Sequence, residues 1–161
     1  MNLEQILLGI QLASVFLLLG LSVYIFAKWQ TKLQGYLFFH VIVVLVNNAG
    51  YLMCMLSKTE HEYLLCLKAS YLGRTWVAFS LLLLVISICK QKVSRKLLLG
   101  LSFFHILTYI LVIFVEYNTL YYSSIEFSDD GIFPCINHGN GIWYNINTFI
   151  ILVYIAYGVF H

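Results

Sequence analysis

Residues 97–115 read LLLGLSFFHILTYILVIFV and contain no Asp, Glu, Lys or Arg. A helix that crosses a bilayer needs about 20 apolar residues in succession, because the hydrocarbon core holds no water to satisfy free backbone groups. Residues 6–27 form a second stretch without a charged side chain. Of all 161 residues, 61% are hydrophobic and 10% are charged, whereas about a quarter are charged in a typical soluble domain. The composition therefore excludes a water-soluble globule and predicts a membrane protein.

The hydropathy pattern predicts five membrane-spanning helices in a single transmembrane domain, residues 1–161. The expected spans are residues 3–27, 35–56, 63–89, 97–115 and 142–160, with polar or basic turns between them. The first span does not have the form of a cleavable signal peptide, because no Lys or Arg precedes it and it is too long. The expected fold class is an all-α membrane protein, a bundle of five transmembrane helices.

Lysine and arginine predict the orientation of this bundle, because cytoplasmic loops carry an excess of them. The loops after the first and third spans contain six: Lys28, Lys32, Lys90, Lys92, Arg95 and Lys96. The N-terminus and the other two loops contain one, Lys58. We therefore expect a multi-pass protein of the inner (plasma) membrane, with its N-terminus outside and its C-terminus in the cytoplasm. Its net charge of +2 reflects these loops and does not indicate nucleic-acid binding.

The outer loop, residues 116–141, contains the signals of a small extracytoplasmic β-hairpin between the fourth and fifth helices. Residues 120–127 are rich in β-forming side chains, and Asp130-Gly131 is a typical hairpin turn. Residues 132–136 would form the returning strand. The alternative is an irregular aromatic loop at the lipid interface.

Three segments resemble a known family. Lys68-Ala69-Ser70-Tyr71-Leu72-Gly73 is similar to the K-x-x-Y-x-G segment in the N-terminal seven-helix sensor region of bacterial histidine kinases. Residues 120–134 and 138–144 match the same region in the same order. This region also precedes diguanylate cyclase domains. The resemblance implies a signal-sensing function, two further helices and a cytoplasmic output domain, so that the sequence would be truncated after the fifth helix.

Arg74 is the strongest candidate for a functional residue. It lies eleven residues beyond Tyr63, which is roughly 16 Å along a helix. An ionisable group at such a depth is costly and normally faces the bundle interior or a wet cavity. We expect a cationic pocket that opens outward and binds an unknown small polar or anionic ligand. The other candidate ligand-binding residues are Lys68, Tyr71, Asn47, Asn48 and Asn145.

Two alternatives to this pocket remain open. Arg74 could instead be paired structurally with Asn, Tyr or loop carboxylates, while Lys68 extends to the membrane surface. A small transporter or channel subunit, in which Lys68 and Arg74 line a substrate path, is the alternative function. The aromatic residues near the span ends are interpreted as an interfacial belt: Trp29, Tyr117, Tyr121, Tyr122, Trp143 and Tyr144. Gly50 and Gly73 are expected to allow close helix packing.

The cysteines do not follow any metal-binding spacing. Cys66 and Cys135 are candidates for a disulfide, because both would lie on the oxidising side of the membrane. A Cys54–Cys66 bond, or free thiols throughout, are the alternatives. We expect no catalytic residues, no metal and no cofactor, and the chain itself is not expected to be an enzyme. The expected partners are the lipid bilayer, the small ligand and, as a candidate, a second copy in a homodimer.

Overall fold

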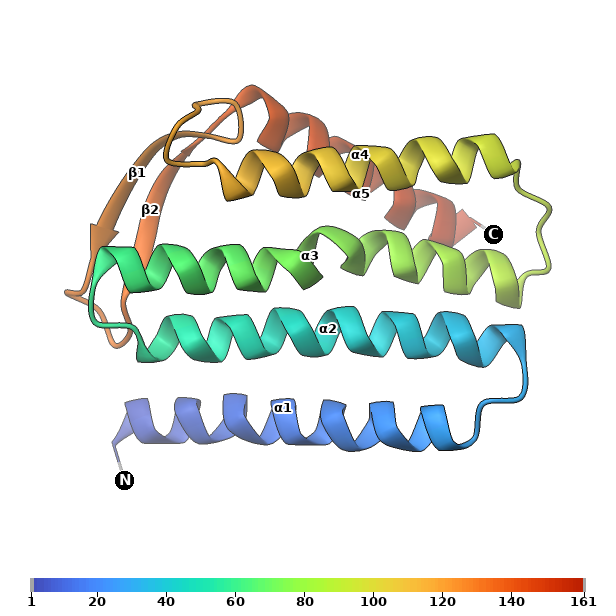
Figure 1. The fold of residues 1–161 in the computed structure, drawn as a ribbon, viewed down its shortest axis with the longest axis horizontal. Helices are drawn as coiled ribbons and strands as arrows, with labels where there is room; N and C mark the ends of the chain where they lie inside the picture. The colour runs from blue at the N-terminus through green and yellow to red at the C-terminus, as the bar shows by residue number, and fades with distance from the viewer. Residues whose placement is uncertain (1, 161) are drawn as a thin grey trace.

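The structure, a computed structural model that describes residues 2–160, contains five long helices and one two-stranded antiparallel sheet (Figure 1). The elements are α1 (Leu3–Ala27), α2 (Lys32–Leu56), α3 (Glu60–Ile88), α4 (Arg95–Ile113), β1 (Tyr122–Ser128), β2 (Cys135–Asn140) and α5 (Ile142–Phe160). All five helices are long and apolar enough to cross a membrane. The predicted fold class, a five-helix membrane bundle with a small hairpin, is confirmed.

Helices α2 and α3 begin three residues earlier than the predicted apolar spans, because polar residues at their starts supply N-terminal caps. The α3 helix begins at Glu60 rather than at residue 63, and the Thr59 hydroxyl accepts a hydrogen bond from the Glu62 backbone N–H. At the start of α2, Thr31 and Gln34 form a capping box. A hydropathy pattern locates the part of a helix inside the membrane, whereas the caps decide where the helix begins.

The hairpin differs from the prediction in its second strand. The two strands pair in the register Ile125↔His138 and Phe127↔Ile136, and residues 129–134 connect them. The expected returning strand at residues 132–136 and the tight turn at Asp130-Gly131 are wrong. Pro134 has no backbone N–H for a strand ladder, and β2 begins directly after it at Cys135.

Helix α3 is the centre of the bundle: it packs against α2, α4 and α5, while α1 packs against α2 (Figure 1). The closest approach is between α2 and α3. A Cβ atom on Gly73 would lie 2.2 Å from the carbonyl oxygen of Val43, and a Cβ atom on Gly50 would lie 2.4 Å from the Cα of Ser70. The expected role of both glycines in close packing is therefore supported by the contacts.

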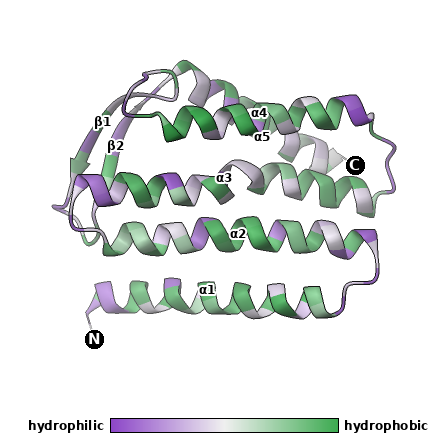
Figure 2. Cartoon of the chain, viewed as in Figure 1, coloured by the Kyte–Doolittle hydropathy of each residue, from purple (hydrophilic) through white to green (hydrophobic). Residues whose placement is uncertain are grey.

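The two ends of the bundle differ in chemistry. The end with the sheet, called the hairpin end below, also contains the turn between α2 and α3 (Figure 1). The opposite end, called the basic end, contains the turns with Lys28, Lys90 and Lys92. Figure 2 shows the helices mainly in hydrophobic colours and the turns in hydrophilic ones. At the hairpin end, a buried cluster joins α3 to the loop before β1 through Tyr63, Leu67, Tyr71, Tyr121 and Tyr122.

The close α2–α3 packing predicts opposite effects for two glycine substitutions. Gly73→Ala should lower the midpoint of thermal unfolding, because overpacking costs about 1–3 kcal/mol and exceeds the gain of roughly 1 kcal/mol in helix propensity. Gly100→Ala is the matched control, since a Cβ on Gly100 meets nothing within 4 Å. It should leave the midpoint unchanged or raise it. Circular dichroism of the purified protein measures both, and a Gly73→Ala protein as stable as the wild type would contradict the packing argument.

Candidate ligand-binding site

The guanidinium of Arg74 is held by tyrosines rather than by a carboxylate. Its Nη1 donates a hydrogen bond of 2.9 Å to the hydroxyl of Tyr51 on α2. Its Cζ lies 4.8 Å from the ring centroid of Tyr71 and 6.0 Å from that of Tyr51, within the range of cation–π attraction. Within residues 2–160, no Asp or Glu forms an ion pair with Arg74. The positive charge is therefore oriented but not neutralised.

The chain around the hairpin builds the aromatic wall above Arg74. The hydroxyls of Tyr71 and Tyr122 share a hydrogen bond, and the ring of Tyr121 lies edge-on to that of Tyr71 at 5.6 Å. The loop is fastened to the start of α5, because the Gly141 N–H donates to the Tyr121 carbonyl at 2.9 Å. Only glycine fits at position 141, since a Cβ there would lie 2.2 Å from the Leu120 carbonyl oxygen.

A small cavity of about 100 Å³, called the polar chamber below, lies between this wall and α5. It is lined by Tyr71, Arg74, Thr75, Tyr121, Tyr144, Asn147, Thr148 and Ile151. The side chain of Asn147 is only 8% exposed, and its Oδ1 atom has no hydrogen-bond partner among the described residues. A buried polar atom without a partner is costly. The chamber therefore combines an unneutralised cation with an unused hydrogen-bonding group.

A larger cavity of about 570 Å³, called the apolar groove below, extends from the same arginine between α3 and α5. Its lining residues are Asn47, Arg74, Val77, Ala78, Leu81, Leu82, Val85, Ile151, Tyr154, Ile155, Gly158 and Val159. Asn47, from α2, also has a buried Oδ1 atom without a partner in the part of the chain that the structure describes. The polar chamber and the apolar groove share Arg74 and Ile151.

The structure brings three of the six predicted ligand-binding residues together. Arg74 and Tyr71 line the polar chamber, and Asn47 joins Arg74 in the apolar groove. Asn48 instead connects α1 to α2, because it accepts a hydrogen bond from Gln11 and donates one to the Val44 carbonyl. Asn145 is exposed on α5, and Asn147, two residues further on, takes the place in the chamber that was expected for it.

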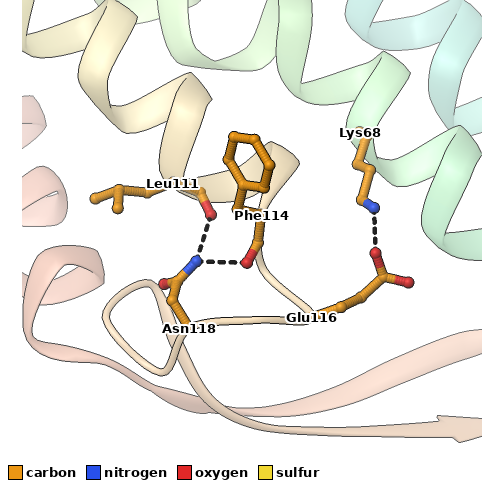
Figure 3. A network of polar contacts seen from close by, with 5 residues as sticks. All are labelled: Lys68, Leu111, Phe114, Glu116 and Asn118. Atoms are coloured by element: carbon orange, nitrogen blue, oxygen red, sulfur yellow. Dashed lines mark hydrogen bonds and ion pairs between the residues drawn. The ribbon is translucent and has the colours of Figure 1, made fainter.

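Lys68 lies away from the chamber and has a structural partner. Its Nζ forms an ion pair with the carboxylate of Glu116, which follows α4 (Figure 3). In the same loop, Asn118 Nδ2 donates to the carbonyls of Leu111 and Phe114, the latter just after the end of α4 (Figure 3). The ion pair and this cap together fix the loop that leads into β1. The charge of Lys68 is thus paired, and that of Arg74 is the one that remains available to a ligand.

Sequence analysis missed the tyrosines of the chamber wall. Tyr121 and Tyr122 are 2% and 3% exposed, so their interpretation as interfacial belt residues is wrong. Burial raises the pKa of both phenols, which keeps their hydroxyls protonated. A Tyr-Tyr pair directly before a β-forming segment was the available signal, but its partners, Tyr71 and Tyr144, lie on other helices.

Neither the cysteines nor the other side chains that could bind a metal form a further site among the described residues. Among the described residues, no disulfide joins any two of Cys54, Cys66, Cys89 and Cys135. The disulfide between Cys66 and Cys135 stays a prediction, as does the rival bond to Cys54. Among residues 2–160, no three His, Cys, Asp or Glu side chains are grouped so that they could hold a metal ion.

Five membrane-length helices, a short hairpin and a cavity lined by Arg74 between them define a multi-pass membrane protein with a polar cavity against α3 and α5. The family model described as the N-terminal 7TM region of histidine kinase matches residues 10–161. The chain belongs to this family, as the three quoted motifs predicted. It is therefore part of a membrane-embedded sensor region of the inner membrane, and that region is not catalytic. No curated protein and no solved structure matches the chain.

His138 on β2 provides a measurable reporter of the charge on Arg74. Its ring stacks on Tyr122 at 4.0 Å, and burial, followed by the positive charge of Arg74, lowers its pKa below the usual 6.5. The neutral form is thus favoured in the folded state. His138 therefore does not lower the free energy of unfolding above about pH 6.5, where its ring is neutral in both states. The free energy of unfolding decreases as the pH falls toward the lowered pKa.

Arg74→Gln should raise the pKa of His138 toward 6.5, because one of the two causes of the shift is removed. A pH titration of the histidine ring signals by NMR measures the change. Lys68→Gln is the matched control, since the charge of Lys68 is paired with Glu116, and it should leave the His138 signal in place. An equal change in both variants would contradict the electrostatic contact between Arg74 and His138.

Proposed function

We propose that this sensor region receives its signal by binding a small polar or anionic ligand in the polar chamber. The observation that carries the proposal is the state of Arg74, a cation at membrane depth without a carboxylate partner among the described residues. Natural proteins rarely leave such a charge without compensation. An anionic ligand would supply it, while the unpartnered Oδ1 of Asn147 could accept a hydrogen bond only from a donor, such as a water that accompanies the anion.

The chamber is proposed to face the outside of the cell. Six Lys and Arg residues lie in the turns and the adjoining helix starts of the basic end, which the positive-inside rule assigns to the cytoplasm. The hairpin end, where Tyr121 lines the chamber, would then be the extracytoplasmic side. A ligand could reach the chamber without crossing the membrane.

Binding would act on the packing of α5. The chamber has walls from α3, from the loop before β1 and from α5, so a ligand between them forms contacts that the empty bundle lacks. It would favour whichever arrangement of α3 and α5 gives the better contacts. The change would be passed to an output domain, for which a histidine kinase agrees with the family. A diguanylate cyclase output and a homodimeric receptor stay predictions, and the family favours a sensor over a transporter or channel subunit.

The proposal predicts that stabilisation of the protein by an anion depends on Arg74 and not on Lys68. In a panel of sulfate, phosphate, acetate and butyrate at matched ionic strength, at least one anion should raise the thermal unfolding midpoint of the purified protein, because a ligand that binds only the folded state stabilises it. Lys68→Gln should keep this shift and Arg74→Gln should lose it. Equal shifts in the two variants would refute the role of the chamber. So would the absence of any shift in both the wild type and Lys68→Gln.

The orientation is tested independently of the ligand. In a background without the native cysteines, single cysteines at Thr59 and Ser128 should react with a membrane-impermeant thiol reagent in intact cells. Cysteines at Lys32 and Ser94 should react only after the membrane is opened, because these positions lie at the basic end. Labelling of position 94 from outside would reverse the topology and place the chamber on the cytoplasmic side.

A further inference from the structure

The apolar groove is bordered by one face of α3 and one face of α5. Along α3, its lining residues follow Arg74 at intervals of three and four positions, through Val77, Ala78, Leu81, Leu82 and Val85. Along α5, they follow Ile151 at the same intervals, through Tyr154, Ile155, Gly158 and Val159. Because residues spaced in this way share one face of a helix, two facing apolar stripes border the groove. The two helices start at the same end, so the stripes extend together toward the basic end (Figure 1).

The polar groups of the groove are confined to the end nearer the hairpin. Arg74 is the first groove residue on α3, and Asn47 lies at the same level, since its backbone N would be 2.6 Å from a Cβ on Gly73. Every α3 residue that lines the groove beyond Arg74 is apolar. Val85 lies eleven residues beyond Arg74, so this stripe is roughly 16 Å long. An extended alkyl chain of about a dozen carbons has a similar length, given carbon–carbon bonds of about 1.5 Å.

We propose that the ligand of this sensor region is a single-chain amphiphile of the long-chain carboxylate class. Its carboxylate binds Arg74 at the polar chamber, and its alkyl chain lies in the apolar groove between α3 and α5. The proposal rests on the proposed function and names the chemistry of the ligand. The protein changes from a polar, charged lining to an apolar one at Arg74 and Ile151, which the chamber and the groove share. Such a ligand changes in the same way, from its carboxylate to its alkyl chain.

The size of the chamber favours a carboxylate over the head group of a membrane phospholipid. The chamber volume is about 100 Å³, and one water needs about 10–15 Å³ of such space, so the chamber holds only a small group and a few waters. This volume accommodates a carboxylate but not a phosphodiester with its glycerol and two chains. Because lipid tails are as apolar as the groove, an alkyl chain gains little from leaving the bilayer. Selectivity would therefore come from the charge of Arg74 and from the fit of the chain.

Photolabelling tests where such a ligand lies. The probe is dodecanoate with a diazirine at the end of its alkyl chain, added to the purified protein in phosphatidylcholine nanodiscs. After irradiation, peptide mass spectrometry should find the label on Val85, Gly158 or their neighbours at the basic end of the groove. Unlabelled dodecanoate should compete with the probe, whereas dodecanol, which has no carboxylate, should not.

Two variants test the head and the tail separately. Arg74→Gln should reduce labelling about tenfold or more, the size expected for the loss of charge-assisted hydrogen bonds. Gly158→Leu should place a side chain in the far end of the groove, since a Cβ on Gly158 would already lie 3.7 Å from Val85. It should weaken competition by dodecanoate and spare competition by octanoate. Gly100→Leu, whose added side chain starts in open space, is the matched control and should leave both unchanged.

The outcomes separate this inference from the proposed function. If acetate competes as well as dodecanoate and the competition depends on Arg74, the chamber binds anions but the amphiphile is refuted. The inference is also overturned if dodecanol competes with the probe as well as dodecanoate does, or if Gly158→Leu leaves competition by dodecanoate unchanged. No label in the groove would mean that bilayer lipid fills it. In a receptor that carries the two further helices of the family, loss of labelling would mean that these helices fill it.

Discussion

The close approach of α2 and α3 at Gly73 determines where the charge of the bundle lies. A Cβ at this position would lie 2.2 Å from one backbone atom of α2 and 2.6 Å from another, so the two helices are in backbone contact there. The next residue is Arg74. The contact therefore fixes the depth and direction of the guanidinium relative to Tyr51 and Asn47, which belong to α2. Without it, α2 would stand further from α3, and the tyrosine that orients the cation would be out of reach.

Arg74 and Lys68 lie six residues apart on the same helix and are treated differently by the fold. Lys68 faces the loop after α4 and is paired with Glu116. Arg74 faces α2 and α5, where the described residues offer tyrosine rings and amides but no acid. Cation–π contacts and one neutral hydrogen bond orient a guanidinium without cancelling its charge. The asymmetry identifies Lys68 as a structural cation and leaves Arg74 as the candidate for recognition of a ligand.

The sequence predicted what hydropathy and local chemistry control, and it failed where distant segments meet. Five spans followed from long apolar stretches. Arg74 could be singled out because a charge is unusual inside a membrane helix, and Gly73 because small residues allow helices to pack closely. The burial of Tyr121 depends on Tyr71 and Tyr144, which lie on two other helices, so no local pattern contains it. The choice of Asn147 over Asn145 depends on the rotation of α5 about its axis. The start of β2 at Cys135 is an exception, because it has a local cause: Pro134 has no backbone N–H for the strand ladder.

Helix α5 is held unevenly, and this bears on how a signal could leave the site. Trp143 near its start donates a hydrogen bond to Thr108 of α4, and Tyr154 is hydrogen-bonded to His105 of the same helix. Beyond Tyr154, Tyr157 packs against the cluster of Phe79 and Leu82, whereas Ile155, Gly158 and Val159 line the apolar groove, and Gly158 has no side chain to fill it. In the proposed arrangement, an alkyl chain anchored at Arg74 would reach this part of α5. The ligand would then act directly on the packing of the basic end, which the proposed orientation puts at the cytoplasm, and the hairpin half of the bundle would not have to move.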